Sequence, residues 1–353
     1  MNMPLLEVKN LKVYFKIRKG TVKAVDDVSF TLDEGETLGL VGESGCGKTT
    51  TAFAITRLLA SNGHIVGGEI YFDGQKIGEA VPDFGKGIFA ESKLKKFEKM
   101  QEERMQTVRW KQISVIFQSA MNAFNPVYKV GDQIMEALRV HEKMTREQAK
   151  QRTIELFQLV GLDPRRINGY PHEFSGGMRQ RAMIAMALAC NPKLIIADEP
   201  TTALDVIMQD RILKEIKDLQ KKLKIAMIII THDISVVAEV ADKIAIMYAG
   251  KIVEYGDIVA IFHRTSHPYS IGLLGAFPSI KGKKRRLDAI PGSPPDLANP
   301  PTGCRFHPRC KYVKDICKDR EPEMMEVEKN HWAACHFAYE VFNARVSAEE
   351  VKM

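Results

Sequence analysis

The chain has 353 residues, of which 45% are apolar and 27% are charged, and its net charge is +7. This length allows about two domains with a substantial core, and the composition is that of an ordinary globular protein. No run approaches the roughly 18 apolar residues of a membrane-spanning helix, no export signal is visible, and no basic stripe is interleaved with aromatics, so we expect a cytoplasmic protein that does not bind nucleic acid.

In the first part of the chain, apolar and polar residues alternate as in β-strands around residues 6–9 and 25–32. An apolar run at residues 37–41 then leads into Gly42-Glu43-Ser44-Gly45-Cys46-Gly47-Lys48-Thr49, a complete G-x-x-x-x-G-K-[ST] phosphate loop before a predicted helix. The glycines let backbone N–H groups point at phosphate oxygens, and Lys48 adds an ammonium for the same oxygens. The Thr49 hydroxyl is placed to ligate Mg²⁺. The sequence therefore predicts a nucleoside triphosphate site.

The middle of the chain alternates between helical and apolar segments. Residues 67–74 read as a strand with a tight turn, and the charged segment at about 79–112 reads as an insertion that forms a solvated helix or loop. A buried strand then ends on Gln118, and a helical stretch covers about 130–159. Further helices are expected at 178–189 and 208–223, with apolar strands at 194–197 and 226–230. This alternation predicts a parallel sheet with helices on both faces.

Polar residues at the ends of these strands complete a catalytic set. Asp198 ends a buried strand, where its carboxylate can hold Mg²⁺, and Glu199 can accept a proton from the water that attacks the γ-phosphate. His232 can fix that water and the γ-phosphate, and Gln118 can reach both the metal and the water. Phosphoryl transfer needs mainly positioning and charge stabilisation, which this set supplies.

A second anion site is predicted at Phe174-Ser175-Gly176-Gly177-Met178-Arg179-Gln180. It places Ser175, Gly176 and Gly177 at a helix N-terminus, where backbone N–H groups attract phosphate. One domain cannot fold this site and the phosphate loop onto the same nucleotide.

These motifs, with Ala203-Leu204-Asp205, resemble the ATPase domain of ABC transporters over about residues 5–262. The resemblance implies an α/β P-loop NTPase fold with a RecA-like parallel sheet, an antiparallel β subdomain and a helical subdomain at about 119–180. It implies a head-to-tail dimer in which each ATP lies between one phosphate loop and the partner's Ser175–Gln180 motif, with Asp205 at the interface. Phe15 falls where the family stacks a ring on adenine, and Tyr14 competes for that role. The implied ATP-binding residues are Phe15, Gly42, Ser44, Gly45, Cys46, Gly47, Lys48, Thr49, Thr50, Ser175, Gly176, Gly177 and Asp205, and the implied Mg²⁺ ligands are Thr49, Gln118 and Asp198.

The stretches at 178–193 and 198–206, and His267-Pro268-Tyr269 with a proline-rich tail, are similar to the oligopeptide/dipeptide importer branch, closest to the first of its two paralogous ATPases. The segment at 79–112 and Met178-Arg179 directly after the glycines depart from the general pattern. The branch implies a paralogous ATPase subunit or a second copy, two transmembrane permease subunits, an extracytoplasmic substrate-binding protein and a place on the cytoplasmic face of the membrane. Peptide cargo is expected, with oligosaccharides or nickel as alternatives. A soluble ABC ATPase that acts on ribosomes or nucleic acid is a remote alternative.

The composition of the chain changes past about Phe262, where basic residues and then prolines cluster, and we predict a nucleotide-binding domain at 1–265 and an extension at 266–353. A basic run at 281–286 is interpreted as a solvated loop, with contact to anionic lipid as the alternative. Four cysteines follow, Cys304, Cys310, Cys317 and Cys335, with five, six and seventeen residues between them. Their spacing allows a zinc site, an iron–sulfur site or plain thiols. The resemblance implies a [4Fe–4S] cluster on these cysteines, in a structural or regulatory role.

Overall fold

The computed structural model describes residues 3–81, 87–118, 123–202, 204–275 and 290–350. These form two compact units, one of residues 1–32, 38–99 and 231–353 and the other of residues 33–37 and 100–230. The basic run at 281–286 lies outside the described residues, so both interpretations of it stay predictions. The predicted domain boundary at residue 265 also stays a prediction.

The first unit contains an antiparallel sheet in the order β2-β1-β4-β5. Its strands are β1 (Leu6–Ile17), β2 (Gly20–Leu32), β4 (Gly63–Phe72) and β5 (Gln75–Glu79). Asp73 and Gly74 both have positive φ, 50° and 74°, which matches the tight turn that joins a two-stranded hairpin. The strand and turn predicted at residues 67–74 are therefore confirmed.

A second run of strands in this unit has the order β11-β12-β10-β9-β3. These are β11 (Met325–Glu328), β12 (His331–Ala333), β10 (Lys251–Asp257), β9 (Lys243–Tyr248) and β3 (Thr37–Val41). β3 pairs with β9 in parallel, whereas the other neighbours are antiparallel. Two strands of the C-terminal extension thus continue the sheet of the cassette beside β10.

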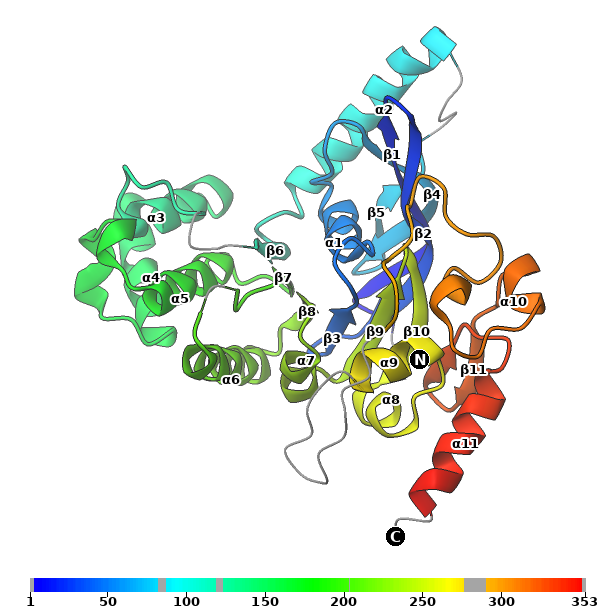
Figure 1. The fold of residues 1–353 in the computed structure, drawn as a ribbon. Helices are drawn as coiled ribbons and strands as arrows, with labels where there is room; N and C mark the ends of the chain where they lie inside the picture. The colour runs from blue at the N-terminus through cyan, green and yellow to red at the C-terminus, as the bar shows by residue number, and fades with distance from the viewer. Residues whose placement is uncertain (1–2, 82–86, 119–122, 203, 276–289, 351–353) are drawn as a thin grey trace. The chain divides into compact units, whose positions relative to one another are not determined.

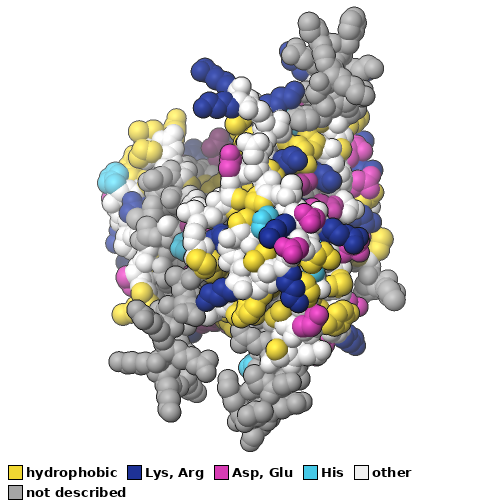
Figure 2. All heavy atoms as spheres, turned by 45° about the vertical axis from the view of Figure 1, so that its right-hand side comes forward, with side chains coloured by type: hydrophobic (Ala, Val, Ile, Leu, Met, Phe, Trp, Pro, Cys, Tyr) yellow, Lys and Arg dark blue, Asp and Glu magenta, His cyan; other side chains and the backbone are white. Residues whose placement is uncertain are grey.

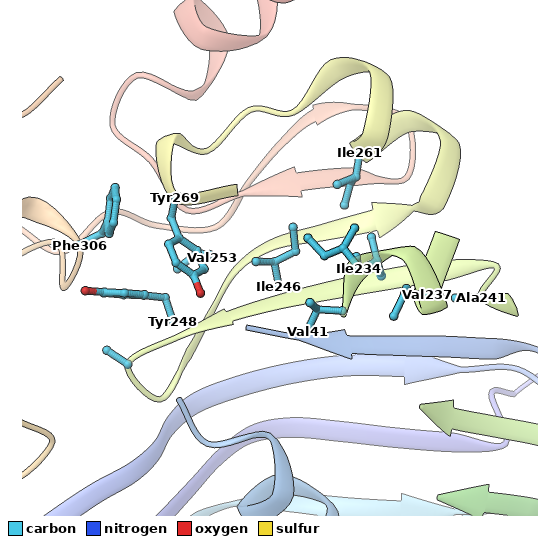
Figure 3. Packing of buried hydrophobic residues seen from close by; sticks show 12 residues of the cluster. Val41, Ile234, Val237, Ala241, Ile246, Tyr248, Val253, Ile261, Tyr269 and Phe306 are labelled. Carbon is cyan, nitrogen blue, oxygen red and sulfur yellow. The ribbon is translucent and has the colours of Figure 1, made fainter. Parts of the chain in front are cut away.

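The helices of the first unit lie around these strands (Figure 1). They are α1 (Lys48–Thr56), α7 (Ile234–Val240), α8 (Ile258–Arg264), α9 (Pro268–Gly275), α10 (Ile316–Asp319), α11 (Ala338–Glu350) and the 3₁₀ turn η4 (His307–Arg309). Figure 3 shows the core that α7, β9 and the residues after β10 build together, with Val41, Ile246 and Ile261 among its buried members. Because the extension contributes Phe306 to this core, it is packed into the first unit.

The second unit holds a parallel run of strands in the order β8-β7-β6, namely β8 (Ala226–Thr231), β7 (Leu194–Asp198) and β6 (Ile113–Ile116). All residues of β7 and β8 are buried, as expected of parallel strands covered on both faces. The helices are α3 (Val130–His141), α4 (Arg146–Leu159), α5 (Gly176–Ala187) and α6 (Val206–Leu223), with 3₁₀ turns η2 (Pro164–Asn168) and η3 (Pro171–Glu173).

Two predictions for helices need correction. The stretch at 130–159 is two helices, because Lys143 adopts a φ of 54° and Thr145 starts α4 with a capping box to Gln148. The charged segment at 79–112 forms α2 (Gly87–Gln106), but it is not solvated all round, since Gln101 and Met105 are fully buried.

Charges of both signs lie among one another on the face that Figure 2 shows, rather than in one continuous patch of described residues. Within the part of the chain that the structure describes, no helix combines the length and the apolar character needed to cross a membrane.

Candidate functional site

The phosphate loop connects β3 to α1, as the sequence predicts. The tip of the loop at Ser44 and Gly45 is exposed, and Thr49 and Thr50 are half-buried in the first turn of α1. The Nζ atom of Lys48 lies inside the loop and donates to the carbonyl oxygens of Gly42 at 2.7 Å and Glu43 at 3.0 Å. Gly47 caps α1 without a side-chain acceptor, so the N–H groups of the first turn are left to an external anion.

Glycine is required at two positions of this loop by contact as well as by backbone conformation. Gly42 has a φ of 154°, and a Cβ atom there would lie 2.2 Å from the carbonyl oxygen of Met247. Gly47 has a φ of 110°, and its Cβ atom would lie 2.4 Å from the carbonyl oxygen of Ala24. The backbone of β9 and β2 therefore passes so close to the loop that a side chain at either position would push it out of place.

Cys46 is buried beside the Lys48 ammonium, with Nζ and Sγ 3.7 Å apart. Burial raises the pKa of the Cys46 thiol, and the nearby Lys48 charge opposes that rise. The thiol is therefore held in its neutral form within the loop.

Phe15 and Tyr14 on β1 differ in what they are free to contact. The Tyr14 hydroxyl donates to Asp26 Oδ1 at 2.8 Å, and burial followed by this bond raises the pKa of Tyr14. Phe15 is half-buried and lies against Gly63, where a Cβ atom would be 2.4 Å from the Phe15 ring. Its ring has no polar group that must be satisfied, so it is the better of the two for stacking on a base.

In the second unit the structure brings Glu199 and Gln118 together. Gln118 Nε2 donates to Glu199 Oε2 at 2.8 Å, and Thr202 Oγ1 donates to the same oxygen at 3.0 Å. Glu199 has a φ of 47°, which is uncommon for a residue with a side chain and typical of functional sites, and its N–H donates to the carbonyl oxygen of Ile230. Asp198, directly before it, is buried at the end of β7. A carboxylate pair at the end of a buried strand is suited to holding a metal and a water.

The glycine motif and the Asp205 segment also meet in this unit. Ser175 caps α5, with its Oγ accepting from the N–H of Met178 at 3.3 Å. Asp205 caps α6 and accepts from the N–H of Met208 at 2.9 Å, and the Met208 side chain fills the space over Gly177. Ser175 and Asp205 are both exposed. In the first unit, His232 is an exposed residue between β8 and α7.

Comparison with known proteins identifies the family. The model of the ABC transporter family matches residues 25–202, and the model described as the oligopeptide/dipeptide transporter C-terminal region matches residues 253–317. The chain is 49% identical over 332 residues to the oligopeptide transport ATP-binding protein OppD of Bacillus subtilis, covering 93% of this chain and 87% of that protein. This chain belongs to the ABC transporter ATPases.

Further relatives support the same assignment of this ABC ATPase. The dipeptide transport ATP-binding protein DppD of Lactococcus lactis is 44% identical over 332 residues, with 93% of this chain and 89% of that protein covered. A solved dimeric ATP-binding cassette in a post-hydrolysis state, bound to ADP and phosphate, is 26% identical at a TM-score of 0.58, with 72% of this chain and 98% of that chain covered. The predicted family, the cassette fold and ATP hydrolysis are therefore confirmed.

The four cysteines of the ABC ATPase's extension are free thiols, with Cys317 and Cys335 buried and Cys304 and Cys310 half-buried. Burial raises the pKa of Cys304 to about 11 and that of Cys335 to about 12. Among the described residues, no three or more His, Cys, Asp or Glu side chains are arranged as a set of metal ligands. A cluster on these cysteines therefore stays a prediction.

Sequence reasoning missed a contact between the extension and the phosphate loop. The guanidinium of Arg309 forms an ion pair with the Glu43 carboxylate, although 266 positions separate the two residues. Tyr269 belongs to the His267-Pro268-Tyr269 motif, and its hydroxyl accepts the N–H of Glu43 at 3.0 Å. Neither spacing nor composition carries a signal for this pair, because Glu43 lies in a loop and Arg309 ends the short 3₁₀ turn η4, and neither segment has a periodic pattern that points to the other.

Proposed function

We propose that this ABC ATPase is the ATP-hydrolysing subunit of an importer of dipeptides or oligopeptides. The observation that carries the proposal is the match of residues 253–317 to the C-terminal region of oligopeptide/dipeptide transporters, which lies outside residues 25–202, where the general ABC transporter model matches. Relatives named as oligopeptide and dipeptide transport ATP-binding proteins support it over 93% of the chain.

In this proposal the phosphate loop and Phe15 hold ATP. Lys48 turns from its carbonyl acceptors toward the phosphates, and Thr49 binds Mg²⁺ with Gln118 and Asp198. Support comes from the exposed loop tip and from the first-turn N–H groups of α1, which no side chain caps. Positive helix-end charge and backbone donors together favour a phosphate.

Glu199 acts as the general base toward the attacking water, and His232 fixes the γ-phosphate. The bond from Gln118 Nε2 supports this role, because a donor on one carboxylate oxygen fixes the direction of the other. Ser175, Gly176, Gly177 and Asp205 contact the nucleotide that a partner ATPase holds. The exposure of Ser175 and Asp205, at the starts of α5 and α6, supports this role. ATP binding closes the pair and hydrolysis reopens it.

The partners are a paralogous ATPase or a second copy, two permease subunits and an extracytoplasmic binding protein that selects the cargo. The chain then sits at the cytoplasmic face of the membrane by contact with the permease. Two exposed apolar residues after Gln118, Val127 at 70% exposure and Tyr128 at 58%, support a docking surface there.

We further propose that Cys304, Cys310, Cys317 and Cys335 bind a [4Fe–4S] cluster. The chemistry of the four side chains supports this proposal, since thiolates are the usual ligands of such a cluster and backbone N–H groups approach two of the sulfurs. The N–H of Tyr312 lies 3.4 Å from Cys310 Sγ, and that of Phe337 lies 3.5 Å from Cys335 Sγ. Such donors stabilise the thiolate form, against the burial that disfavours it.

Two experiments test these proposals separately. The first compares uptake of a labelled tetrapeptide, nickel and an oligosaccharide in cells that lack this chain, restored with the wild type or with Glu199→Gln. Peptide uptake that returns with the wild type alone supports the cargo, whereas return of nickel or oligosaccharide uptake without peptide uptake contradicts it.

The second experiment measures iron, sulfide and zinc per chain after anaerobic purification, with an absorption spectrum. About four irons and four sulfides, lost in Cys310→Ser and kept in the control Cys190→Ser, support the cluster. Stoichiometric zinc or an absence of metal refutes it and leaves the ATPase role unaffected.

A further inference from the structure

The extension contacts the phosphate loop through the side chain of Arg309. Arg309 Nη1 lies 2.6 Å from Glu43 Oε2 and Arg309 Nη2 lies 2.9 Å from Glu43 Oε1, so the pair is bidentate. The side chain of Arg309 is 6% exposed, and its Nε donates to the carbonyl oxygen of Pro291 at 2.7 Å. A buried, bidentate and charge-assisted pair of this kind fixes the orientation of both partners. A segment that is far from Glu43 in the sequence therefore fixes the position of the Glu43 side chain.

Three packed aromatic rings lie beside this ion pair. Figure 3 shows the rings of Tyr248, Tyr269 and Phe306 beside one another. The centroids of the two tyrosine rings are 4.7 Å apart, and that of Phe306 is 5.2 Å from Tyr248 and 5.4 Å from Tyr269. The Tyr248 hydroxyl accepts from Arg309 Nη1 at 3.3 Å, and the Tyr269 hydroxyl accepts the backbone N–H of Glu43 at 3.0 Å. Both the side chain and the backbone of Glu43 are therefore fixed by the C-terminal part of the chain.

A second arginine of the same segment holds the neighbouring backbone. Arg305 forms an ion pair with Asp26 and donates to the carbonyl oxygen of Ala249. The next residue, Gly250, accepts the Asp26 N–H and donates its own N–H to the carbonyl oxygen of Cys46, each at 2.8 Å. Arg309 thus contacts the loop directly, whereas Arg305 holds Asp26 and Ala249, which adjoin the Gly250 that is hydrogen-bonded to the loop.

We propose that the C-terminal extension positions the phosphate loop for ATP, and that Arg309 is the positioning residue through which it does so. This inference rests on the proposed ATP site and adds a residue outside the cassette motifs. Glu43 lies inside the phosphate loop, so holding its side chain and its backbone N–H restricts the conformations of the loop before ATP binds. A loop that is already ordered loses less conformational entropy when ATP binds. Removing the Arg309–Glu43 ion pair therefore weakens ATP binding without changing any group that contacts the nucleotide.

The test measures the affinity of the full chain for a non-hydrolysable ATP analogue with Mg²⁺, together with the melting temperature. The variants are Arg309→Gln, Arg309→Lys, Glu43→Gln and the double variant Glu43→Gln/Arg309→Gln. The matched control is Arg320→Ala. Arg320 is exposed on the same extension, and the hydrogen bonds that the described residues give it are made by its backbone: its N–H donates to the Ile316 carbonyl oxygen at 3.0 Å and its own carbonyl oxygen lies 2.9 Å from His336 Nε2.

We expect Arg309→Gln to weaken binding by about tenfold, Arg309→Lys by less, and Arg320→Ala by less than about twofold. The double variant should bind no more weakly than the weaker single variant, because both single changes remove the same contact. Arg309→Gln with the affinity of Arg320→Ala overturns the inference. The inference is also overturned if the loss of affinity in the double variant equals the product of the losses in the two single variants.

Two controls separate this inference from the rest. If Arg309→Gln lowers the melting temperature, Glu43→Gln serves as the test instead, because it removes the same contact from the loop side and leaves the extension unchanged. Wild-type ATP affinity in Glu43→Gln then overturns the inference. Lys48→Ala reports on the ATP site itself. Undiminished ATP binding by Lys48→Ala refutes the proposed site. If Lys48→Ala abolishes binding but Arg309→Gln binds as tightly as the wild type, only the role of Arg309 is refuted.

Discussion

Replacing Glu199 by glutamine tests the proposed general base with the least change in shape. The Glu199 carboxylate accepts from Gln118 Nε2 at 2.8 Å and from Thr202 Oγ1 at 3.0 Å. Glutamine keeps one oxygen as an acceptor, but its amide cannot take a proton from the attacking water. General-base catalysis contributes a factor of about 10²–10⁴, which corresponds to about 2.7–5.4 kcal/mol at 1.36 kcal/mol per factor of ten.

The structural cost of the same change is much smaller. Both hydrogen bonds end on one oxygen of a half-buried carboxylate, and bonds of this kind contribute about 1.5–3 kcal/mol even with a charged acceptor. Since glutamine retains an acceptor, we expect a loss of about 1 kcal/mol or less in the free energy of unfolding. The drop in turnover should therefore exceed anything that local destabilisation produces.

The assay is phosphate release at saturating MgATP by the complete transporter, with ATP affinity and melting temperature measured on the same variant. We expect turnover to fall by a factor of about 10²–10⁴, with ATP still bound and a closed dimer accumulating. Glu103→Gln removes an exposed carboxylate and is the matched control. Turnover of Glu199→Gln within about threefold of the control would refute the role, because a base contributes at least about 10².

Three further predictions concern the loop and a buried histidine. Lys48→Ala should weaken MgATP binding by at least about tenfold, since it removes the one ammonium inside the loop; wild-type affinity would contradict this. Gly42→Ala should abolish binding in a titration with MgATP, because its Cβ atom would meet the Met247 carbonyl oxygen at 2.2 Å, whereas Gly20→Ala, at a φ of 141° in open space, should not; equal effects would refute the steric argument. Burial lowers the pKa of His267 from 6.5 to about 3, so below pH 6.5 the unfolded chain takes up a proton that the folded chain does not. The free energy of unfolding should then fall by about 1.4 kcal/mol per pH unit between pH 6 and pH 4 through this group alone. Urea titrations should show His267→Asn with a shallower dependence on pH than the wild type, and parallel curves would refute the shift.

The local features of this protein follow from the sequence. The phosphate loop, the turn at Asp73-Gly74 and the buried strand before Asp198 are each encoded by neighbouring residues whose conformational preferences decide the outcome. The pairing of Gln118 with Glu199 was also predictable, because adjacent parallel strands bring their carboxyl ends to one edge.

Contacts between distant segments were decided by the tertiary structure. The burial of Met105 on α2 was missed because a charged helix shows which face is polar but not what covers the remainder. The continuation of the sheet by β11 and β12 depends on the exposed edge of β10 that receives them. The ion pair of Arg309 and Glu43 needs the phosphate loop and η4 to be brought together by the core around Tyr248 and Phe306. Local sequence sets backbone preference over a few residues, whereas such a pair depends on the packing of segments that are far apart in the chain.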